Sequence, residues 1–102
     1  MSTNSHVITL DQAQTMTHAF QNATQFQGLT VASMIDKDAY QLVMDQPGCV
    51  NIRTYFALNE AGTLTIVVVG VDASGADMMD GVLLNRALNC PTTCFINSEL
   101  MI

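Results

Sequence analysis

A stripe of apolar residues at helical spacing is the first strong pattern along the chain. Its members are Leu10, Ala13, Met16, Phe20 and Ala23. Polar side chains occupy the opposite side, which is typical of an amphipathic helix. Thr9 and Gln12 have the spacing of a capping box, which satisfies free N–H groups where a helix begins. The pattern therefore predicts a helix over about residues 10–25.

A second and shorter helix is predicted after residue 35. Asp36 can cap it, and Asp38 suits the positive end of its dipole. Its buried side is expected from Ile35, Ala39, Tyr40, Leu42 and Val43. Pro47-Gly48 ends it. The apolar stretch 29–35 before this helix fits either a strand or a lead-in.

Strand periodicity is clearest over residues 49–71. Residues 50–58 alternate in hydrophobicity, 59–62 read as a turn, and 63–71 are rich in β-branched residues. If Leu58 lies opposite Thr63, then Ile52 faces Val69 and Thr54 faces Val67. A one-residue bulge would exchange the two faces. In either register the second strand is apolar on both faces, so we expect helices on one side and more protein on the other.

The remaining sequence is less regular. Asp72 to Asp77 reads as a polar turn with Gly75 at positive φ, because the full calcium-loop pattern needs a Glu where Leu83 stands. Residues 78–89 fit either strand or helix. Pro91 can open a short helix over 90–94, and a further helical turn is expected over 98–102. No repeat or linker interrupts the chain, which predicts a single domain over residues 1–102.

The composition and charge of the chain exclude several classes of protein and of partner. The 102 residues include three basic and nine acidic side chains, a net charge of −6, and only 12% are charged, whereas soluble domains average about 25%. With 49% hydrophobic residues, the chain is not of the disordered class. Three cations cannot neutralise a phosphate track, so nucleic acid is not expected as a partner. Scarce surface charge predicts apolar faces covered by further copies of the chain, a homo-oligomer, or by a protein partner.

The sequence shows neither a targeting signal nor a membrane-spanning segment. The N-terminal residues lack a basic region followed by an apolar one. The longest apolar run, 66–71, is far shorter than the ~20 residues that span a bilayer. We therefore expect a cytoplasmic protein without a membrane partner, and an odd count of three cysteines fits a reducing compartment.

Cys90 and Cys94 are the strongest candidates in the sequence for a chemically reactive site. Four positions apart on a helix, they would share one face. They can serve as a redox pair or a regulated disulfide, as metal ligands with Cys49 as a third member, or as small buried apolar residues. A structural zinc site needs four ligands, usually two close pairs, and no second pair exists. No metal and no cofactor are therefore expected.

Arg53 and Tyr55 form a second candidate site. They lie two positions apart on one strand and therefore share a face. An arginine among apolar neighbours needs a carboxylate of its own protein or an anionic ligand. Both alternatives stay open: an internal or inter-subunit ion pair, and a small-anion site. His18 lies on the polar side of the first predicted helix, where a surface role is expected.

Three motifs carry a resemblance. They are Gln46-Pro47-Gly48-Cys49-Val50-x-Ile52-Arg53-x-Tyr55, Val69-Gly70-Val71-Asp72-Ala73-x-Gly75-x-Asp77-Met78 and Cys90-Pro91-x-x-Cys94. In these motifs the chain resembles a group of small uncharacterised bacterial proteins, over residues 46–94. The resemblance implies no activity. It marks for testing Gly48, Cys49, Arg53, Tyr55, Gly70, Asp72, Cys90 and Cys94.

These observations predict an α+β fold. Two N-terminal helices are expected to pack on a small, mainly antiparallel sheet centred on the hairpin 49–71. The expected function is a non-enzymatic interaction or structural module that forms a homo-oligomer. The alternatives are a thiol-based redox or metal-binding protein using Cys90 and Cys94, and a small-anion binder around Arg53.

Overall fold

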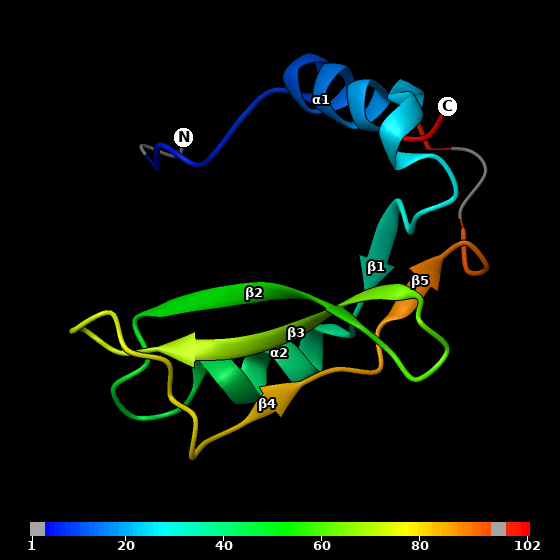
Figure 1. The fold of residues 1–102 in the computed structure, drawn as a ribbon. Coiled ribbons are helices and arrows are strands. Elements are labelled where there is room, and N and C mark those ends of the chain that lie inside the picture. Colours follow the sequence, from blue (N-terminus) through cyan, green and yellow to red (C-terminus); the bar gives the residue numbers. More distant parts are fainter. Residues whose placement is uncertain (1–3, 95–97) are drawn as a thin grey trace.

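The computed structural model describes residues 4–94 and 98–102 (Figure 1). In chain order the elements are α1 (Leu10–Asn22), the 3-10 helix η1 (Thr24–Phe26), β1 (Ala32–Met34), α2 (Lys37–Met44), β2 (Asn51–Leu58), β3 (Leu64–Val71), β4 (Leu83–Leu84) and β5 (Leu88–Cys90). β2, β3 and β4 form one sheet in that order, and β1 pairs with β5 in a second. Every pairing between these strands is antiparallel. The predicted α+β class is confirmed.

Both helices begin where their capping residues predict. The Thr9 side chain accepts from the Gln12 N–H at 3.1 Å, and the Gln12 side chain accepts from the Thr9 N–H at 2.9 Å. Asp36 accepts from the Ala39 N–H at 2.7 Å. α1 ends at Asn22 and not near residue 25, because the chain tightens there into η1.

The hairpin is confirmed, but the expected register is wrong by one residue. Leu58 pairs with Leu64, so the loop holds the five residues 59–63. Asn59 extends the loop, because its side-chain oxygen accepts from the N–H groups of Ala61 (3.0 Å) and Thr63 (2.9 Å). As a result Arg53 lies opposite Val69, and Tyr55 lies opposite Val67.

The core lies between α2 and the three-stranded sheet. Val43 of α2 and Val68 of β3 are fully buried and form one cluster with Leu84 of β4. On the other face of β3, Val69 and Val71 are also buried. The doubly apolar strand is therefore covered on both faces, as its sequence predicts.

Packing of both helices on the sheet is only partly confirmed. α1 contains no buried residue, and it lies well away from the sheet in Figure 1. The reason is the path that follows it: the chain runs through η1 into β1, and β1 pairs with β5 instead of with the hairpin. Of the two helices, only α2 packs on the sheet, and it covers one face.

The C-terminal third contains strands and turns. The ambiguous segment 78–89 supplies β4 and the start of β5. The expected helix at residues 90–94 is wrong. β5 continues to Cys90, and residues 91 and 92 form a turn in which the Thr93 N–H donates to the Asn89 carbonyl at 2.8 Å. Residues 99 and 100 form a turn and not a helix. Within the described ranges, no helix combines the length and apolar character that crossing a membrane requires.

Candidate functional site

Arg53, Tyr55 and Asp77 meet on one face of the sheet. Arg53 Nη1 donates to Asp77 Oδ1, and the Tyr55 hydroxyl donates to Asp77 Oδ2. A bridge between Val71 and Asp77 holds the carboxylate beside β3. The hydrogen bond that Arg53 donates to Asp77 is the main cause that raises the pKa of Arg53 above its ordinary value, followed by its hydrogen bond with Tyr55. This is the internal-pair alternative for Arg53.

The Asp77 carboxylate restricts what this cluster can bind. The Arg53 side chain is 44% exposed and that of Asp77 is 18% exposed, so the pair is accessible from solvent on the arginine side. A small anion would have to compete with Asp77 for the donors of both Arg53 and Tyr55. Ligand binding at these two residues stays a prediction.

The side chain of Asp72 accepts the hydrogen bonds that hold the turn before Asp77. Its Oδ1 accepts from the Ser74 hydroxyl at 2.6 Å, the Ser74 N–H at 2.9 Å and the Ala76 N–H at 3.1 Å. These bonds, the Ser74 hydroxyl first, lower the pKa of Asp72 below its ordinary value. Gly75 has φ +88°, as the turn pattern predicts. The aspartate is therefore a structural acceptor in a polar turn.

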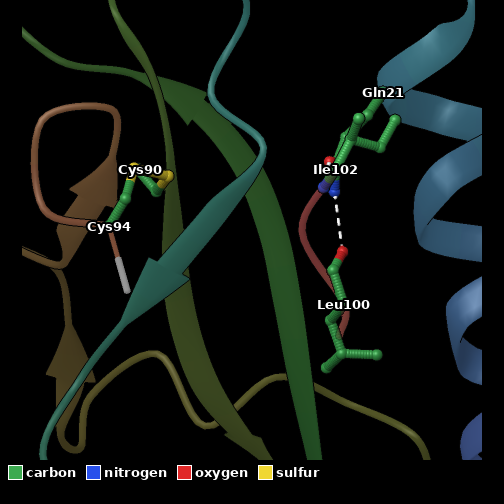
Figure 2. The surroundings of a disulfide bond; sticks show 5 residues. All are labelled: Gln21, Cys90, Cys94, Leu100 and Ile102. Carbon is green, nitrogen blue, oxygen red and sulfur yellow. Dashed lines mark hydrogen bonds between the residues drawn. A yellow bond between two sulfur atoms is a disulfide. The ribbon is translucent and has the colours of Figure 1, made fainter. Parts of the chain in front are cut away.

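Cys90 and Cys94 form a disulfide, with their Cα atoms 4.8 Å apart (Figure 2). Cys90 is buried at the end of β5, and Cys94 is exposed. Of the alternatives for this pair, the one in which both cysteines are small buried thiols is therefore wrong, because the two sulfurs are bonded to each other. The local turn brings the two sulfurs together, where a helix would only have placed them on one face.

Cys49 is a free thiol far from that pair. Its Sγ donates to the Asn51 carbonyl at 3.3 Å, and it lies beside Gly70, near the end of β3. β5 meets β3 at its other end, where Asn89 accepts from Thr65 at 3.3 Å. Five strand residues span about 16 Å, so Cys49 is not a third member of the pair. The described part of the chain contains no group of three or more His, Cys, Asp or Glu side chains able to hold a metal.

An apolar groove of about 500 Å³ lies between the α1–β1 segment and the hairpin. One wall includes Phe20, Phe26 and Leu29, with the two phenylalanine rings stacked at 4.9 Å between centroids. The other wall includes Phe56 and Leu64. Sequence reasoning missed this groove, because its aromatic residues come from three separate elements. The scarcity of charge was the only signal for it.

Two glutamines join segments that are distant in sequence. Gln46 donates to the Val43 carbonyl at 3.0 Å and accepts from the Val82 N–H at 2.8 Å, which ties the end of α2 to the approach to β4. Gln21 donates to the Leu100 carbonyl at 3.0 Å and accepts from the Ile102 N–H at 2.9 Å, which ties α1 to the C-terminal residues (Figure 2). His18 lies 3.1 Å from the Glu99 carbonyl and so contributes to the same contact.

A second cavity of about 380 Å³ lies beside β1 and the start of α2. Its lining includes Asp36, which caps α2, and Arg86. Arg86 has φ +55°, a backbone region that non-glycine residues rarely adopt. Neither cavity includes Arg53 or Tyr55 in its lining.

The chain was compared with protein-family models, with curated proteins and with solved structures, and none of them matches it. The resemblance to small bacterial proteins is therefore still an expectation.

Proposed function

We propose that the protein is a non-enzymatic interaction module that assembles into a homo-oligomer. The observation that carries this proposal is its surface area of 7725 Å². A compact monomer of 11.0 kDa has an accessible surface of about 5,600 Å². The excess of about 2,100 Å² falls in the range that one subunit of an obligate homodimer buries, on the order of 1,000–2,500 Å².

The dimensions of the chain support the same proposal. Its radius of gyration is 15.3 Å, whereas about 13 Å is usual for a compact domain of this length. The radius of gyration is larger because α1 and the small β1–β5 sheet extend away from the main sheet (Figure 1). Contact with another molecule would bury apolar surface that this arrangement leaves exposed.

The chemistry of the exposed surface also fits association. Phe56 and Leu58 of β2 are 82% and 70% exposed, and Phe56 forms part of the apolar groove. Burying apolar surface stabilises an assembly by about 25 cal/mol per Å². Few charges oppose such contact, because the whole chain carries only twelve.

Light scattering coupled to size-exclusion chromatography tests the proposal. At micromolar concentration the expected mass is a multiple of 11.0 kDa. The mass is also expected to fall on dilution, because association depends on concentration. A strict 11.0 kDa monomer at every concentration measured would overturn the proposed function.

A second candidate function is thiol-based redox activity, and one observation favours it. The disulfide between Cys90 and Cys94 has one exposed member, Cys94, which a reducing thiol can attack. Equilibration with defined glutathione mixtures, read by thiol titration, tests this function. A disulfide that stays intact at every ratio of a cytosolic range would exclude redox exchange and leave a structural role. Metal analysis of the native protein tests the metal-binding form of the same candidate.

A further inference from the structure

β2 is an open edge of the three-stranded sheet. The Asn59 N–H donates to the Thr63 carbonyl at 3.0 Å. In an antiparallel pair, successive residues bond alternately to the two sides of the strand. The odd-numbered residues of β2 therefore bond to β3. The even-numbered residues, from Ile52 to Leu58, direct their N–H and C=O groups to the open side.

This edge lacks the usual barriers to pairing. Natural edge strands are protected by short length, proline, lysine or a bulge. β2 has eight residues, none of them proline or lysine, and its ladder to β3 is continuous from Asn51 to Leu58. Its one charged residue is Arg53, whose guanidinium is engaged by Asp77 on the face of the sheet. Nothing on the strand itself opposes another strand.

We infer that β2 pairs antiparallel with β2 of a second copy, which joins two three-stranded sheets into one of six strands. The inference rests on the proposed homo-oligomer and names the surface that forms it. A second copy is favoured because an antiparallel pair of identical strands is self-complementary about a two-fold axis. With the axis at Tyr55, Ile52 of one copy lies opposite Leu58 of the other, on one face of the joined sheet.

The side chains of the edge fit this arrangement. Ile52, Phe56 and Leu58 share a face and are 40%, 82% and 70% exposed. Cross-strand pairs between large apolar residues stabilise antiparallel ladders. Arg53 would lie opposite Ala57 and not opposite another cation, so the two copies do not repel each other at the ladder. The excess surface of about 2,100 Å² leaves room for such an interface.

Thr54→Pro is the decisive variant, because the Thr54 N–H points to the open edge. Proline at that position keeps the ladder to β3 and blocks a strand on the other side. Thr54→Val is the matched control, since it keeps both the backbone N–H and the β-branched shape. In light scattering, the proline variant is expected to raise the dimer dissociation constant at least tenfold. The valine variant is expected to stay dimeric.

Amide hydrogen exchange on the wild-type chain keeps the inference testable if Thr54→Pro does not fold. In the dimer, the N–H groups of Ile52, Thr54, Phe56 and Leu58 are expected to be protected, and to lose protection on dilution. A wild-type monomer would overturn both the proposed function and this inference. A dimer whose four edge amides exchange freely, or a folded Thr54→Pro variant that stays dimeric, would overturn only the inference.

Discussion

Tyr55 and Asp77 are joined by a hydrogen bond although 22 positions separate them in the chain. Asp77 also receives the guanidinium of Arg53, so one carboxylate connects the loop after β3 to the edge strand β2. The same contact positions the turn that Asp72 organises. The cluster therefore fixes how the β3–β4 connection lies on the sheet.

Removal of the tyrosine hydroxyl tests this contact. Tyr55→Phe is expected to lower the free energy of unfolding by about 0.5–1.5 kcal/mol, the usual net value of a hydrogen bond. Urea denaturation followed by circular dichroism measures it. In an Asp77→Ala background the same substitution is expected to cost almost nothing. An equal cost in both backgrounds would show that Asp77 is not the partner.

A pH series tests the acceptor role of Asp72. Its hydrogen bonds lower its pKa in the folded chain, whereas the pKa of an unfolded aspartate is about 3.9. The stabilisation is therefore complete above about pH 3.9, and it is lost as the pH falls through the lower folded value. The difference in Tm between wild type and Asp72→Asn should be largest above pH 4 and shrink below it. Ser74→Ala, which removes the main cause of the shift, should reduce that difference.

Two substitutions test where the core lies. Val43→Ala removes methyl groups from a fully buried position and is expected to cost about 2–3 kcal/mol. Met16→Ala on α1, where the side chain is 65% exposed, is expected to change stability by less than about 0.5 kcal/mol. Chemical denaturation at one protein concentration measures both. Equal losses at the two positions would contradict the separation of α1 from the sheet.

Local signals predicted the elements of the fold more successfully than their arrangement. The capping residues Thr9 and Asp36 mark both helix starts, because a cap depends only on neighbouring residues. The hairpin register failed by one residue, because Asn59 adds a loop position that alternation along the strands does not record. The predicted position of α1 was wrong, because an apolar stripe predicts that a helix face is buried but does not predict which element covers it.

The candidate sites were also predicted in their local features but not in their distant partners. The sequence marked Arg53 and Tyr55 as sharing a face, but their carboxylate partner lies in a turn 22 to 24 positions later. Gln46 gave no signal beyond its place in a motif, because its two backbone partners belong to α2 and to the approach to β4. Contacts made across separate elements are decided by tertiary packing, which one sequence does not display.

The thiol count provides the sharpest test of the cysteine chemistry. Denatured protein isolated without reductant is expected to show one reactive thiol, Cys49, and three after reduction. Disulfides persist mainly in oxidising compartments, so three thiols in freshly isolated protein would instead support the cytoplasmic expectation. The disulfide closes a loop of five residues, so its reduction is expected to lower stability by about 2 kcal/mol.

In the folded chain the disulfide lies at the junction of β1 and β5. There the Val31 N–H donates to the Cys90 carbonyl at 2.8 Å, so the bonded cysteine anchors the small sheet. A double variant, Cys90→Ala with Cys94→Ala, is the control, because its unfolding should not respond to reductant. Cys49→Ala should respond to reductant as wild type does. If the double variant responded equally, the loss would have to come from elsewhere in the chain.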